Sequence, residues 1–187
     1  MPENAIRSYP INALGLTSYD KITANGKNGI KSGVTTDADG EASLTIKDLT
    51  LNISAPVNDA INAEQLLNIE SGTLNISAAD DAVHCDLVLN IVADGTDGLT
   101  IDIAECYEGL EAAELNVLSG NISILSSDDC LSAANSDLGS YDFSMNISGG
   151  TINAYSSEGD GLAEETARPL IRRKSQQAKP KQARRRN

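Results

Sequence analysis

The chain has 187 residues, of which 40% are hydrophobic and only 3% aromatic, so it is long enough for one domain with an aliphatic core. No apolar run reaches the roughly 18–20 residues of a membrane-spanning helix, which argues against such a helix. The formal net charge is −13, but residues 1–163 sum to −20 and residues 164–187 to +7. So acidic a body repels nucleic acids and anionic membranes, and we expect divalent metals or neutral ligands as its partners.

The two ends differ from this body. Residues 1–24 are expected to form an N-terminal lead-in or cap, and they show no signal-peptide pattern, so either the protein is cytoplasmic or the sequence begins inside a longer precursor. Residues 164–187 are basic, have little to bury and are predicted to be disordered. This tail is either a non-native or linker-like end or an arm that binds polyanions. Three cysteines without C-x-x-C spacing predict neither a disulfide framework nor a zinc motif.

A short phrase recurs between these ends. It consists of an acidic or amide residue, a small residue, a branched aliphatic residue, a polar residue and a second small residue. Intervals of 21 and 22 residues between some copies, with loop insertions between others, are typical of a solenoid. A sixth copy lacks its second small residue because Glu164 stands there. The copies begin at Asn28, Asp59, Asp81, Glu108, Asp129 and Asp160.

Triplets with short alternating patterns lie between the copies of the phrase and predict further short strands. In chain order they are Leu67-Asn68-Ile69, Leu74-Asn75-Ile76, Leu89-Asn90-Ile91, Ile101-Asp102-Ile103, Leu115-Asn116-Val117, Ile122-Ser123-Ile124, Met145-Asn146-Ile147 and Thr151-Ile152-Asn153. Three strands per repeat, separated by Gly or polar corners, predict an all-β fold. We expect a parallel β-helix of about five to six rungs over residues 25–163, right-handed like ordinary parallel crossovers.

Rungs about 4.8 Å apart would place like residues in columns. We expect Cys85 to be a small core residue and Cys130 to occupy a tight corner, rather than either being a reactive thiol. The columns predicted to point inward are Ile61, Val83, Leu110, Leu131 and Leu162, and, two residues later, Ala63, Cys85, Ala112 and Ala133.

The same stacking gathers acidic side chains at one corner of the coil. Like charges one rung apart repel each other, so a neutralising cation is expected. Ca²⁺ takes oxygen ligands at about 2.3–2.6 Å, which suits two carboxylates on adjacent rungs. We therefore predict calcium as the cofactor, with the candidate ligands Asn58, Asp59, Asp80, Asp81, Glu108, Glu111, Asp128, Asp129 and Asp160.

An alternative for this corner needs no metal. The aspartates would form a solvated edge and accept backbone N–H bonds at the turns, as Asx motifs do. His84 is then a hydrogen-bonding partner of the carboxylates, although it is also a candidate ligand. Transition-metal catalysis needs more nitrogen or sulfur ligands than this corner offers.

Paired carboxylates such as Asp80-Asp81 and Asp128-Asp129 raise a second alternative, a pectin-active β-helix enzyme, because glycosidases use two carboxyl groups with unlike pKa values. The Asn-Thr-Asp, Gly-His-Gly and Arg-x-Lys motifs of polygalacturonases are absent from residues 25–163. A lyase needs a cationic base beside its calcium, whereas the Lys and Arg residues of the body all lie in its first third. We therefore predict that the protein is not an enzyme.

Four runs carry a resemblance to a known family: Ser77–His84 (SAADDAVH), Cys106–Glu111 (CYEGLE), Ser126–Ser132 (SSDDCLS) and Ser148–Ile152 (SGGTI). They resemble secreted bacterial carbohydrate-binding domains over about residues 25–163. The resemblance implies a right-handed parallel β-helix outside the cell or at its surface, which binds calcium and binds polygalacturonate and cellulose without cleaving them. The chain departs from this pattern where Asn58 replaces an Asp, where Ala or Cys replaces Gly in three phrases, and in its shortened last repeat.

Polygalacturonate is the ligand that the resemblance and the charge favour together, because calcium with open coordination positions would bridge two sets of carboxylates. Cellulose would instead need exposed rings, for which Tyr107, Tyr141 and Tyr155 are the candidates, with His84 as a further sugar contact. A structural surface solenoid, in which calcium only joins the corners, is the remaining alternative. We expect a monomer whose uncapped end invites association.

Overall fold

The computed structural model describes residues 6–8, 19–33, 43–93 and 98–164. All regular structure in these ranges is β-strand. The described residues contain no helix long and apolar enough to cross a membrane. The strands are β1 (Ile6–Ser8), β2 (Tyr19–Thr23), β3 (Ile30–Ser32), β4 (Ser43–Ile46), β5 (Leu49–Ala55), β6 (Ile61–Ala63), β7 (Leu66–Ile69), β8 (Gly72–Ala78), β9 (Val83–Ile91), β10 (Leu99–Cys106), β11 (Leu110–Val117), β12 (Asn121–Ser126), β13 (Leu131–Ala133), β14 (Ser144–Ile147), β15 (Thr151–Ser156) and β16 (Leu162–Glu164).

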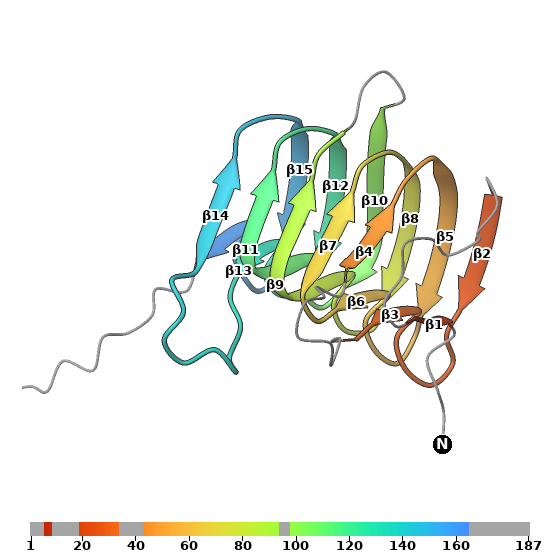
Figure 1. Ribbon diagram of the computed structural model, residues 1–187, viewed down its shortest axis with the longest axis horizontal. Coiled ribbons are helices and arrows are strands. Elements are labelled where there is room, and N and C mark those ends of the chain that lie inside the picture. The colour runs from red at the N-terminus through yellow and green to blue at the C-terminus, as the bar shows by residue number, and fades with distance from the viewer. Residues whose placement is uncertain (1–5, 9–18, 34–42, 94–97, 165–187) are drawn as a thin grey trace, which may run out of the picture.

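Two parallel sheets form the walls of a solenoid (Figure 1). One has the order β15-β12-β10-β8-β5-β2 and takes one strand from each successive coil. The other follows the order β1-β3-β6-β9-β11-β13-β16. It continues round a second wall of the solenoid, where β4 pairs with β7, β7 with β9, and β14 with β11. The strands β9 and β11 run through both parts of this sheet, with a register shift where they bend.

The predicted parallel β-solenoid is confirmed. Its described residues make about four full turns, so the expected five to six rungs are reached when the partial coils at both ends are included. The strands β1 and β2 lie in the segment expected to be a lead-in, and they pair in register with β3 and β5. The tail predicted to be disordered lies outside the described residues from position 165 on.

Aliphatic columns fill the interior, as the alternating patterns predict. Ile61, Val83, Leu110 and Leu131 are fully buried, and so are the small residues two positions later, Cys85 among them. Cys130 is also fully buried, at the corner. Leu162 was expected in the same inward column, but it is 56% exposed because β16 is the outermost described strand and no described coil covers it.

Glycine makes the tight corner that leads into the six-stranded sheet possible. Gly72 has a φ of +107° and Gly120 one of +100°, a backbone region that other residues rarely adopt. A Cβ atom at Gly72 would lie 2.1 Å from the carbonyl oxygen of Leu49 in the neighbouring coil. The close approach of successive coils at this corner therefore depends on a residue without a side chain.

Candidate functional site

Backbone hydrogen bonds hold the predicted acidic corner in register. The N–H of Gly29 donates to the carbonyl of Asp59 at 3.0 Å, and the N–H of Ala60 donates to the carbonyl of Asp81 at 2.9 Å. The same bond recurs in the later coils, where the acceptors are Glu108, Asp129 and Asp160. The anchor residues of the repeats therefore stand in one column, which we call the acidic column: Asn28, Asp59, Asp81, Glu108, Asp129 and Asp160.

Three carboxylates converge near the middle of this column, and we call them the aspartate cluster: Asp59, Asp80 and Asp81. One oxygen from each lies within 4.8 Å of the others. Asp59 and Asp81 are buried, at 6% and 8% exposed. The amide of Asn62 donates from Nδ2 to Asp59 Oδ2 at 2.7 Å, which orients that carboxylate. Burial raises the pKa of Asp59, and the charge of Asp80 adds to that effect.

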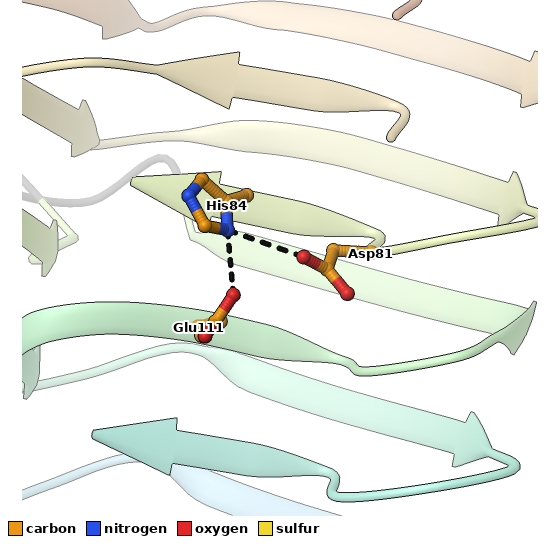
Figure 2. Close-up of side chains that lie close together, drawn as sticks. All are labelled: Asp81, His84 and Glu111. Atoms are coloured by element: carbon orange, nitrogen blue, oxygen red, sulfur yellow. Dashed lines mark hydrogen bonds and ion pairs between the residues drawn. The ribbon is translucent and has the colours of Figure 1, made fainter. Parts of the chain in front are cut away.

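A second cluster shares Asp81 and contains the histidine (Figure 2). His84 Nδ1 lies 2.6 Å from Glu111 Oε2 on the next coil and 3.1 Å from Asp81 Oδ2. On the other side of the ring, Nε2 lies 2.9 Å from Asp86 Oδ1. Three carboxylates thus contact one imidazole, which lies between two coils.

The charge of His84 follows from these contacts. Burial alone would lower the pKa of the imidazole, but its hydrogen bonds to Asp81, Asp86 and Glu111 outweigh burial and raise the pKa to about 12. The ring is therefore an imidazolium at neutral pH. No other residue between positions 48 and 163 can carry a positive charge, because the sequence has no Lys or Arg there. His84 is the local counter-ion for this part of the column.

Acidic residues further along the column have less compensation. The pKa of Glu108 rises to about 8, mainly through burial and then through the charges of Glu111, Asp81 and Asp129. Burial likewise raises the pKa of Asp81 to about 6, although its bond to His84 acts in the opposite direction. Burial is therefore the main cause of both shifts, and the neighbouring carboxylates add to it.

The remaining predicted ligands have other contacts. Asp129 Oδ1 accepts a hydrogen bond from the backbone N–H of Asp160 at 2.7 Å, which is the metal-free turn arrangement considered as an alternative. Asn58 donates from its amide to Asn28 Oδ1. Asp128 hydrogen-bonds the phenol of Tyr107 and raises the pKa of that tyrosine to about 12. The structure therefore gathers some of the candidate ligands into clusters and leaves others in separate contacts.

The candidate sugar-binding tyrosines lie on different elements. Tyr107 stands at the corner after β10 and is 48% exposed, and Tyr155 lies on β15 and is 66% exposed. Tyr141 precedes β14, where its hydroxyl donates to Glu114 Oε1 at 2.5 Å and its ring lies 5.9 Å from that of Phe143. They come from the corner, the six-stranded sheet and a loop.

Two contacts of the corner lie outside the set of residues predicted from the sequence. Asp86 fixes the second nitrogen of His84, and the spacing of two residues along a strand was the available signal, because such residues share a face. Lys31 donates to Asn62 Oδ1 at 2.5 Å and pairs with Glu64 at 2.7 Å. Lys31, Asn62, His84 and Glu111 occupy one register position, so a lysine in an early coil stands in the same column as a glutamate three coils later.

The aspartate cluster fits a calcium ion on the chemistry of its donors. Oxygens that ligate one Ca²⁺ at about 2.3–2.6 Å lie within about 5 Å of each other. The three carboxylates meet this condition at 4.8 Å or less. The cluster around His84 is different because it already contains a cation. Its mixed nitrogen and oxygen donors also suit calcium less well than carboxylates alone.

The fold and this corner together define a parallel β-solenoid with an acidic column along one edge. A family model described as "Carbohydrate-binding domain-containing protein" matches residues 17–161. That match spans well over half of the chain, so the protein belongs to this carbohydrate-binding domain family. No curated protein and no solved structure matches the chain.

Proposed function

We propose that this protein binds an acidic polysaccharide of the polygalacturonate class in a calcium-dependent and non-catalytic manner. The observation that carries the proposal is the aspartate cluster, in which two buried carboxylates and a third one offer oxygens within 4.8 Å of one another. Membership of a carbohydrate-binding family supports a carbohydrate as the ligand. A bound calcium ion would supply the positive charge that both the protein carboxylates and the uronate groups need.

The residues have distinct tasks in this proposal. Asp59 and Asp81 form the buried side of the site, and Asn62 keeps Asp59 oriented through its 2.7 Å hydrogen bond. Asp80 is less buried than these two and forms the side that faces the ligand. His84 neutralises Asp81 from the adjacent cluster, which limits repulsion within the column.

Two observations favour binding over cleavage. The family is a binding family by its description. A lyase also needs a free base, and the one basic side chain between positions 48 and 163 is His84, whose two ring nitrogens both contact carboxylates. A pectin-active enzyme would release unsaturated or reducing ends from polygalacturonate, and we expect no such product. With a cell-wall polysaccharide as ligand, the protein would act outside the cell.

Affinity electrophoresis in gels that contain polygalacturonate tests the proposal. We expect the protein to be retarded with calcium and to migrate freely with EGTA. Asp80→Asn removes one charged calcium ligand without opening the core. The apparent affinity for polygalacturonate, measured from the retardation, should fall at least about tenfold, because calcium affinity depends on the number of charged ligands. Asp102→Asn is the matched control, since it removes an exposed carboxylate from the six-stranded sheet.

Two results would overturn the proposal. One is retardation that persists in EGTA, and the other is equal retardation of Asp80→Asn and the wild type. A purely structural calcium solenoid gives a third pattern, in which calcium raises the melting temperature while no polysaccharide retards the protein.

A further inference from the structure

A lysine, an asparagine and two carboxylates meet between the first coils of the solenoid. Lys31 on β3 and Asn62 on β6 stand opposite each other in the parallel register. Lys31 Nζ lies 2.5 Å from Asn62 Oδ1 and 2.7 Å from Glu64 Oε1. On the other side of the carboxamide, Asn62 Nδ2 donates to Asp59 Oδ2 at 2.7 Å. The amine and the carboxamide are therefore in contact, and each of them also contacts a carboxylate.

This contact places the amine close to the carbonyl carbon of the asparagine. A C=O bond is about 1.23 Å long, so Lys31 Nζ lies at most about 3.7 Å from Asn62 Cγ. Reacting atoms held roughly 3–3.5 Å apart are close to an attacking arrangement. Asn62 is 8% exposed, and the side chain of Lys31 is 19% exposed, so the protein shields the pair from most of the solvent.

We propose that Lys31 and Asn62 form an intramolecular isopeptide bond that joins β3 covalently to β6. Lys31 Nζ attacks Asn62 Cγ, a C–N bond forms between them, and the bond from Cγ to Nδ2 breaks. Of the three protons on the lysine ammonium group, one stays on the new amide nitrogen. The other two pass to the leaving nitrogen, which departs as an ammonium ion. The exchange of one amide for another needs no oxidant, reductant or cofactor.

The two carboxylates provide a route for these protons. Glu64 Oε1, at 2.7 Å from Lys31 Nζ, can accept the proton whose removal frees the lone pair for attack. Asp59 Oδ2, at 2.7 Å from Nδ2, can relay a proton to the leaving nitrogen. The product amide keeps one N–H group, which can take over the hydrogen bond to Asp59.

A second lysine of the early coils provides a comparison. Lys47 also pairs with a glutamate of the next coil, Glu70, at 3.2 Å. Their side chains are 42% and 31% exposed, so this pair is an ordinary surface ion pair. An isopeptide bond at Lys31 would instead prevent the coils that carry β3 and β6 from separating, which matters in a solenoid because each coil contacts only its neighbours.

Mass spectrometry of the full chain tests the bond. We expect the wild type to be lighter than its sequence by one molecule of ammonia, and Lys31→Arg and Asn62→Ala to have their full masses. Lys47→Arg is the matched control and should lack one ammonia like the wild type. Trypsin does not cleave after an acylated lysine, so digestion with trypsin and a glutamate-specific protease should release residues 28–41 joined to residues 48–64.

Three results would overturn the inference. The first is a wild type with its full mass, and the second is a mass deficit that persists in Lys31→Arg, because Asn25-Gly26 and Asn28-Gly29 can lose ammonia by forming a succinimide. The third is a wild-type digest without the branched peptide, which decides the matter even if a variant does not fold. The inference does not rest on the proposed function, since these masses are measured without calcium or polysaccharide.

Discussion

At the scale of single residues, His84 offsets part of the negative charge of the acidic corner. It contacts Asp81, Asp86 and Glu111, and it is the one basic side chain between positions 48 and 163. Removing a charged partner from a poorly solvated cluster leaves the other charges uncompensated. The ring therefore stabilises the fold through the carboxylates around it.

Replacing this histidine with a neutral residue should destabilise the protein. For His84→Gln we expect a loss of roughly 2–3 kcal/mol in the free energy of unfolding, less than for a fully buried pair. The side chain is 20% exposed, so solvent screens part of its interaction. Urea unfolding at pH 7 in metal-free buffer measures the change. A variant as stable as the wild type would contradict this role.

The shifted pKa values also predict how stability depends on pH. The native pKa values of Asp81, about 6, Glu108, about 8, and His84, about 12, all lie above the ordinary values of these groups. The folded state then binds more protons than the unfolded state, and their contribution is lost as pH rises through each native value. We expect the metal-free protein to be less stable towards urea at pH 9 than at pH 5. Higher stability at pH 9 would contradict these shifts.

At the scale of elements, the corner between coils depends on small residues after each acidic anchor. A Cβ atom at Gly109 would lie 2.2 Å from the carbonyl oxygen of Cys130 and 2.7 Å from Ile124 Cγ2. The next coil must therefore move away if a side chain is added. This contact links the spacing of the coils to the spacing of the carboxylates.

Gly109→Ala should cost about 1–3 kcal/mol of stability, the usual range for forcing an extra methyl group into a packed site. Gly161→Ala is the control, because no atom of the described residues lies within 4 Å of its added Cβ. Thermal unfolding of the two variants beside the wild type measures the difference. Equal melting temperatures for Gly109→Ala and the wild type would show that the corner has room.

Much of this architecture could be predicted from the repeat. The phrase at Asp59, Asp81 and Glu108 specified the register, because strands of period two with one buried face admit few alternative pairings. The inward columns followed from the same alternation. Leu162 differs because burial depends on a covering coil, which a local pattern does not contain.

The details of the site were harder to predict from the sequence than the fold. Asp80-Asp81 and Asp128-Asp129 are equivalent in sequence, yet Asp81 joins two clusters while Asp129 accepts the N–H of Asp160. What decides between them is the residue on the neighbouring coil, at a distance in sequence that varies with each loop insertion. A groove beside Asn90 could not be predicted for a related reason. It forms between coils on an outward face, and the sequence of that face shows only the polar positions of alternating strands.

At the scale of the whole molecule, charge organises the binding surfaces. Residues 1–163 sum to −20, and the acidic column stacks five of their carboxylates, so an anionic ligand could bind there only with a cation. The asparagine amides of β7, β9 and β11 lie on another wall of the solenoid, beside a groove whose lining carries one acidic side chain.

The central claim is that stacked coils bring Asp59, Asp80 and Asp81 close enough to hold one calcium ion. Calorimetric titration of calcium into the metal-free protein, with no polysaccharide present, tests it most directly. The account predicts saturable binding, at least about tenfold weaker in Asp80→Asn and unchanged in Asp102→Asn. Absence of binding by the wild type, or equal affinity in Asp80→Asn, would contradict it.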